Sequence, residues 1–158
     1  MNAKKIIQYL DLKPLPIEGG FFREIYRSDK NIAPLNRCFA THIYYLVTPE
    51  DFSPLHKVAS DELFHFYLGD SVEQIQISPD GELRKYRLGV NLLDQEYPMA
   101  AVPANHWQGL RLVEGGAWAL MGCTVAPGFE YEDLQMGIRE NLIKRFPVHA
   151  ESISHFCK

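Results

Sequence analysis

Short runs of alternating apolar and polar residues make up most of the chain, and this period of two is typical of half-buried β-strands. The runs recur at roughly ten-residue spacing, separated by Pro, Gly, Asp and Ser. The turn residues Pro79-Asp80-Gly81 lie between two such runs and predict a hairpin. Strands are expected at residues 21–28, 41–47, 62–68, 72–78, 82–88, 99–102, 107–113 and 117–125.

Two segments show a helical period instead. Residues 2–11 and residues 138–146 carry apolar side chains three and four positions apart, and Pro147 ends the second segment. The stripe of the second segment consists of Ile138, Leu142, Ile143 and Phe146. The whole pattern predicts a mostly β sandwich or barrel with a helix near each end.

Composition narrows the class of protein. A length of 158 residues fits a single domain, residues 1–158. A net charge of −4 without a basic run gives no reason to expect nucleic acid or an anionic membrane as partner. No apolar run is long enough for a signal peptide or a bilayer span. Three distant cysteines read as free thiols, so a cytoplasmic location is expected. They are Cys38, Cys123 and Cys157.

The candidate chemistry lies in His56 and Glu62. Glu62 opens a predicted strand and shares a strand face with Phe64 and Phe66. A carboxylate on an aromatic interior face is partly desolvated, which raises its pKa and suits it to proton transfer or to holding a ligand hydroxyl. A nearby carboxylate can also orient a basic imidazole. The alternatives are a surface carboxylate and a structural histidine.

These residues resemble the first motif of the cupin superfamily, which has two histidines, a glutamate and a glycine. His56, Glu62 and Gly69 match it, and Val58 stands in place of the second histidine. Residues 102–108 follow the outline of the second motif but end in glutamine instead of histidine. The resemblance implies a double-stranded β-helix, or jelly-roll barrel, flanked by an N-terminal and a C-terminal helix. An up-and-down barrel is the alternative.

A second resemblance covers nearly the whole chain. The sequence is similar to the family called domain of unknown function 985, or cupin superfamily 5, which implies a dimeric barrel with a pocket and no established reaction. The segments that carry this similarity are residues 18–24, 41–46, 53–56, 60–62, 107–108 and 122–129, together with His65 and Gly69.

The chain also resembles the dTDP-4-dehydrorhamnose 3,5-epimerases, which are cupins that work without a metal. The similarity lies in residues 20–24, in Leu55-His56, which match the context of the catalytic base, and in Val102-Pro103. Where those enzymes carry a tyrosine acid, this chain has Val125-Ala126. The resemblance therefore implies the base but not the acid of that mechanism.

A metal site would be incomplete. The cupin pattern implies three histidines and one glutamate, but an amide oxygen is a weak ligand and a valine is none. Any metal would be held by His56, Glu62 and Gln108, with added waters. The sequence therefore predicts no cofactor, with a weakly bound divalent metal as the alternative.

Further residues are candidates for ligand binding. Arg23 could anchor an anionic group, the alternative being a surface ion pair, and Gln108 could orient the ligand. His65 is expected on the opposite strand face from Glu62. The remaining residues expected to line the pocket are Phe64, His106 and Trp107.

The function hypothesis is a pocket that binds a small polar molecule, such as a sugar or nucleotide sugar. His56 and Glu62 would then perform acid–base chemistry without a metal. A metal-dependent cupin enzyme and a non-catalytic binding module are the alternatives, so the sequence leaves open whether the protein is an enzyme. A homodimer is expected, because a second copy can cover the edge strands.

Overall fold

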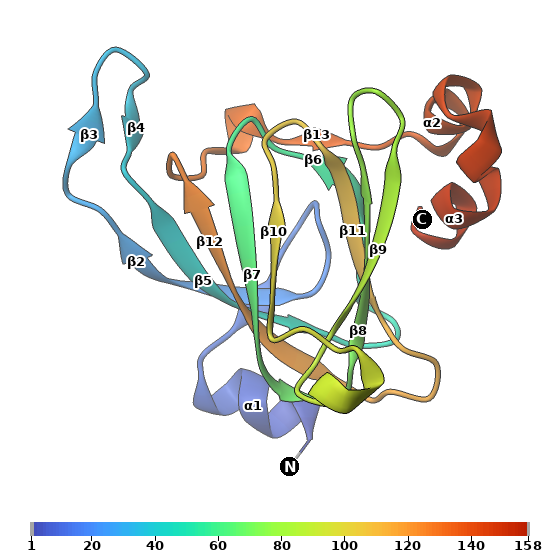
Figure 1. Cartoon of the computed structure of the whole chain (residues 1–158). Helices are drawn as coiled ribbons and strands as arrows, with labels where there is room; N and C mark the ends of the chain where they lie inside the picture. The colour runs from blue at the N-terminus through green and yellow to red at the C-terminus, as the bar shows by residue number, and fades with distance from the viewer. Residues whose placement is uncertain (1, 158) are drawn as a thin grey trace.

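The computed structural model describes residues 2–157 and consists mainly of two facing antiparallel sheets (Figure 1). The six-stranded sheet has the order β1 (Lys13–Pro14), β2 (Phe21–Arg27), β5 (Thr41–Val47), β12 (Ala119–Ala126), β7 (Asp61–Gly69) and β10 (Met99–Val102). The five-stranded sheet has the order β13 (Gln135–Met136), β6 (Ser53–Lys57), β11 (Trp107–Leu112), β8 (Val72–Ile77) and β9 (Leu83–Leu88). Neighbouring strands are mostly distant in sequence, which confirms the jelly-roll prediction and not the up-and-down barrel.

Smaller elements connect and extend the sheets. A two-stranded ribbon of β3 (Asn31–Ile32) and β4 (Arg37–Cys38) extends from one end of the sandwich (Figure 1). Short 3₁₀ turns occupy η1 (Leu92–Asp94), η2 (Tyr131–Asp133) and η3 (Pro147–His149). The ribbon is tied to η2 by Arg37, which binds both Glu132 and Asp133.

Helices cover the outer face of each sheet. Helix α1 (Ala3–Tyr9) begins at its N-cap residue Asn2 and packs against the six-stranded sheet through a cluster containing Ile6, Leu46 and Leu120. Helices α2 (Arg139–Arg145) and α3 (Ala150–His155) cover the five-stranded sheet. None of the described helices is long and apolar enough to cross a membrane.

The C-terminal helical region differs from the prediction in two details. Ile138 is not part of the buried stripe; it lies before the helix in an extended conformation and is 59% exposed. Helix α3 was not predicted, although its residue Ile153 is fully buried. Both helices are short, so tertiary packing rather than periodicity fixes their bounds.

Strand β6 was also missed, because Pro54 argues against a central strand. The N–H of Leu55 donates to the carbonyl of Phe156 and its carbonyl accepts from Gly137, next to β13, so the nitrogen of Pro54 lies on the β11 side. The pairing of β6 with β11 is irregular at this point, which is where a strand tolerates a missing N–H. This strand matters because it carries His56.

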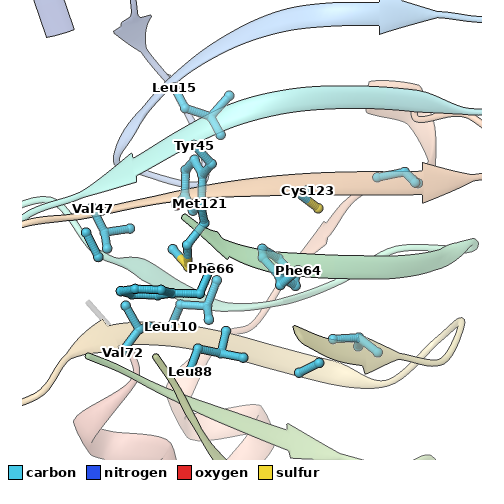
Figure 2. Close-up of a cluster of buried hydrophobic side chains, with 14 of the residues drawn as sticks. Leu15, Tyr45, Val47, Phe64, Phe66, Val72, Leu88, Leu110, Met121 and Cys123 are labelled. Carbon is cyan, nitrogen blue, oxygen red and sulfur yellow. The ribbon is translucent and has the colours of Figure 1, made fainter. Parts of the chain in front are cut away.

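The space between the sheets is filled by an apolar cluster at one end (Figure 2). Residues from both sheets contribute, and those labelled in Figure 2 include Val47, Phe66, Val72, Leu88, Leu110 and Met121. Strand β7 alternates as predicted, because Glu62, Phe64 and Phe66 are buried while their neighbours are more exposed. Glu62 is the polar residue of this buried set, and it lies outside the apolar cluster.

Candidate functional site

His56 lies in β6, directly opposite Gln108 of β11, and its side chain is 2% exposed. Its ring nitrogen Nδ1 is 2.9 Å from the carbonyl oxygen of Pro54. A carbonyl oxygen only accepts hydrogen bonds, so Nδ1 carries the proton in the neutral ring. The other nitrogen, Nε2, is then a bare lone pair that faces the space between the sheets.

Gln108 joins the two sheets at this point. Its amide nitrogen lies 2.8 Å from His56 Nε2 and 3.2 Å from Oε2 of Glu62 on β7. Because Nε2 has no proton, the group facing it must be a donor, which assigns the NH₂ rather than the oxygen of the amide. One amide thus donates to both the imidazole and the carboxylate.

Glu62 is 4% exposed, as its place in the strand alternation predicted. Burial raises the pKa of this carboxyl to about 7, and the negative Glu18 nearby adds to the rise, although His56 and Gln108 oppose it. The thiol of Cys123 approaches the other carboxylate oxygen at 3.9 Å. Burial and the neighbouring carboxylates raise the pKa of Cys123 well above its usual value, so this thiol is not a ready nucleophile.

Glu18 is a site residue that the sequence analysis did not single out. One of its oxygens is 3.5 Å from His56 Nε2, its side chain is 12% exposed, and burial raises its pKa. The loop between β1 and β2 is held in place because the buried Tyr45 hydroxyl donates to the carbonyl of Gly19. The next residue, Gly20, has a φ of +73° and no room for a Cβ beside Tyr45. In the sequence, the Gly19-Gly20 pair is the feature that could have indicated a tight loop next to Glu18.

These groups face a cavity of about 230 Å³ at one end of the sandwich. Its walls are mostly apolar or aromatic, and its polar lining includes His56, Glu18 and Glu62. Arg27 lines the same cavity and pairs with Glu24 at 3.0 Å and Glu130 at 2.7 Å. The other lining residues include Phe22, Thr41, Ile43, Tyr45, Ser53, Phe64, Cys123, Val125, Phe129 and Tyr131.

The structure separates the predicted ligand-binding residues. Phe64 lines the cavity, and Gln108 lies between His56 and Glu62, but three others lie elsewhere. The exposed Arg23 donates to the carbonyl of Leu10. Trp107 packs into the cluster beneath α2 and α3. His106 borders a separate hollow beside β8 and β9, with its Nδ1 3.3 Å from the carbonyl oxygen of Ala104.

His65 lies away from the cavity, on the face opposite Glu62. Its ring is 6.0 Å from that of His42, whose own nitrogens contact Thr124 and Tyr67. The three cysteines are buried and unpaired in the described chain, in agreement with the expected free thiols.

The residues present do not fit a resident metal ion. The amide NH₂ of Gln108 lies between His56 Nε2 and Glu62 and donates to both, so it takes the position that a shared cation would need. Within residues 2–157, no three or more His, Cys, Asp or Glu side chains are grouped to hold a metal ion. A metal-binding alternative through His56, Glu62 and Gln108 therefore receives no support from this geometry.

A jelly-roll sandwich with a histidine and a glutamate meeting inside it, one from each sheet, defines a cupin barrel. The chain belongs to DUF985, a family of the cupin superfamily, and the profile of this family matches residues 4–137. The resemblances to the cupin superfamily and to the DUF985 family are thereby confirmed.

Relatives support the same assignment. The uncharacterized protein YML079W of Saccharomyces cerevisiae is 26% identical over 134 residues, covering 73% of this chain and 66% of the yeast protein, just under two thirds of its length. The crystal structure of protein SO0799 from Shewanella oneidensis has a TM-score of 0.93 and 32% identity, covering 100% of this chain and 98% of that one. A hypothetical protein from Leishmania major has a TM-score of 0.92 and 28% identity, with 99% of each chain covered.

A more distant similarity concerns the fold alone. Oxalate decarboxylase from Bacillus subtilis matches with a TM-score of 0.59 and 17% identity, covering 94% of this chain and 37% of that one.

Proposed function

We propose that the cavity binds a small hydroxylated molecule of about monosaccharide size, and that Glu62 and His56 exchange protons with it without a metal. One observation carries this proposal: a carboxyl with a pKa of about 7 faces the cavity beside an imidazole whose Nε2 is unprotonated. A general acid or base is most effective when its pKa lies near the working pH.

The chemistry that suits this pair is proton transfer beside a carbonyl group. His56 Nε2 takes a proton from the carbon next to the carbonyl, and the substrate replaces Gln108 at this lone pair. Glu62 in its protonated form gives its proton to the carbonyl oxygen, so the electrons of the broken C–H bond form an enol. When His56 returns the proton to the former carbonyl carbon and Glu62 takes back a proton from the hydroxyl on the neighbouring carbon, the product is the isomer with the carbonyl moved by one position.

The charges of the cavity favour a sugar over a nucleotide sugar. Arg27 is the cation that lines the cavity in the described chain, and it already pairs with Glu24 and Glu130. A diphosphate would find no unpaired guanidinium or ammonium among the lining residues of the described chain, whereas a hydroxyl can donate to the carboxylates.

Hydrogen exchange in D₂O tests this proposal. Protein prepared without added metal is incubated with a panel of aldoses and ketoses, and NMR follows deuterium at the carbon beside the carbonyl. We expect exchange that survives chelation, and a loss of at least about 100-fold in Glu62→Gln with binding retained. Glu114→Gln, which removes an exposed carboxylate in a distant turn, is the matched control. Exchange that requires metal, or no exchange with any member, contradicts the proposal.

A binding module without catalysis is the second candidate. It is favoured because Gln108 already satisfies both His56 and Glu62, a stable arrangement that needs no substrate. It predicts that a ligand found by thermal-shift screening is recovered unchanged after long incubation. Turnover of that ligand by the native protein, abolished in Glu62→Gln, would exclude it.

A further inference from the structure

The polar lining of the cavity is strongly unbalanced in charge. Arg27 is the permanently charged cation of this lining in the described part of the chain, and His56 is the other basic side chain there. The carboxylates that line the same space are Glu18, Glu24, Glu62 and Glu130. Glu24 and Glu130 share Arg27 at one side of the cavity, whereas Glu18 and Glu62 flank His56 with no cation of their own.

The acceptors of this inner part have few protein donors. Glu18 is 12% exposed, and the polar group of the protein found beside it is His56 Nε2 at 3.5 Å. The amide oxygen of Gln108 is fully buried and, within residues 2–157, has no partner. Buried acceptors without donors are costly, so this group of side chains has an unmet demand for N–H or O–H.

The apolar part of the cavity suits the same kind of ligand. Phe22, Phe64, Phe129 and Tyr131 line it, and the faces of aromatic rings attract cations. A cation placed among aromatic rings and carboxylates gains from both contacts, whereas an anion would be repelled by the carboxylates.

We infer that the ligand of this cavity is an organic cation, a hydroxylated amine whose ammonium group is held by Glu18 and whose hydroxyls reach the neighbouring Glu62. The inference rests on the proposed function, since it concerns the same cavity, and it narrows the ligand from any small hydroxylated molecule to a positively charged one. The ammonium N–H groups would supply the missing donors at Glu18, and the hydroxyls would contact the rest of the polar lining.

Binding should then be linked to protons. Burial raises the pKa of both Glu18 and Glu62, so both hold protons more tightly than an exposed carboxyl does. An ammonium beside Glu18 favours its ionised form, so the amine displaces protons from Glu18 and its affinity rises as pH increases.

The other titratable groups around the pair do not offset this dependence. Burial raises the pKa of both Cys123 and Tyr45, which therefore stay neutral, and the pKa of Arg27 is raised by its carboxylate partners, so it stays charged. Glu24 and Glu130 are ionised partners of Arg27.

Three probes that differ at a single carbon test the inference. They are 1-amino-1-deoxysorbitol, sorbitol and gluconate, whose first carbon carries an ammonium, a hydroxyl or a carboxylate. Calorimetry gives Kd and the protons released, at about pH 6 and about pH 8, a range in which an alkyl amine stays protonated. We expect the amine to bind at least about tenfold more tightly than sorbitol at the higher pH, with protons released. Gluconate should bind most weakly.

Two variants locate the effect. Glu18→Gln should reduce the ratio of the sorbitol Kd to the amine Kd toward one, whereas Glu114→Gln should preserve it, because Glu114 is exposed and lies outside the cavity lining. Equal binding of amine and sorbitol overturns the inference but leaves the proposed function standing. Tightest binding of gluconate, or no binding of any probe, also overturns the inference, while the proposed proton transfer is judged separately by deuterium exchange.

Discussion

The two ends of the barrel interior are built by the same strands but differ in chemistry. Strand β7 places Phe66 in the apolar end and Glu62 in the cavity, and β12 does the same with Met121 and Cys123. The apolar end has side chains from both sheets packed together (Figure 2), whereas the other end is hollow. A step of two or four residues along a strand therefore separates a stabilising core from a candidate site.

The contrast between the two ends indicates how the fold tolerates a buried carboxylate. Burial of Glu62 opposes ionisation, and its partners offset only part of this cost. The apolar end supplies the burial of large side chains that stabilises the fold as a whole. If this division is right, substitutions at the two ends should shift stability in opposite directions.

The largest effect is expected at the apolar end. Phe66→Ala removes a ring that is 8% exposed and leaves a cavity, so the free energy of unfolding should fall by about 3–5 kcal/mol. Urea denaturation measures the loss. Phe39→Ala, at a ring that is 50% exposed, is the matched control and should cost far less. Equal losses in both variants would show that the apolar end is not the stabilising one.

A smaller effect of opposite sign is expected at Glu62. Its pKa is raised from 4.5 to about 7 in the folded chain, so the folded state holds the proton more tightly than the unfolded state does. The stabilisation present below about pH 4.5 is therefore lost as pH rises through about 7. Glu62→Gln removes this dependence and should be more stable than the native protein by up to about 3 kcal/mol near pH 8.

Thermal or urea unfolding across this pH range measures the difference. Glu114→Gln should follow the native curve throughout, because Glu114 is exposed. Native and Glu62→Gln curves that run parallel from about pH 4 to about pH 8 would contradict a raised pKa at Glu62.

The smallest effects are expected at two arginines of β2. Arg23→Ala should change stability by less than about 0.5 kcal/mol and leave ligand affinity unchanged, because Arg23 lies outside the cavity. Arg27→Ala removes a positive charge from the lining, so the affinity for 1-amino-1-deoxysorbitol should increase about threefold. Titration of both variants with this amine distinguishes them, and a gain in Arg23→Ala would place the ligand elsewhere.

Strand alternation explains which site residues could be predicted. It correctly placed Glu62 and Phe64 inward and His65 outward. The same rule should have excluded Trp107, because it is the strand neighbour of the inward-facing Gln108. The prediction for Trp107 followed the resemblance of residues 102–108 to the second cupin motif instead of the strand alternation.

Irregular backbone accounts for most of the other errors. The register of β2 shifts between Glu24 and Tyr26, so Glu24 and Arg27 both line the cavity although they are three residues apart. Arg23 precedes this shift and faces outward because it alternates with the lining residues Phe22 and Glu24. Asn105 has a φ of +65°, which breaks the phase between His106 and the strand that follows. Such local changes leave little mark on the pattern of apolar residues.

Glu18 could not be found by periodicity, because it lies in a loop whose course is set by Gly19, Gly20 and the distant Tyr45. Its closeness to His56 depends on the tertiary fold. The homodimer and the cytoplasmic location stay predictions, since a single chain tests neither.

Gln108 has a consequence for how this chamber could change over generations. A glutamine codon becomes a histidine codon when its third base alone changes, and the amide of Gln108 already contacts both His56 and Glu62. One substitution there would replace a side chain that never titrates with one that binds protons or cations. A single base change could therefore add a second imidazole beside His56 and Glu62, while Val58 would still leave the histidine set of the cupin pattern incomplete.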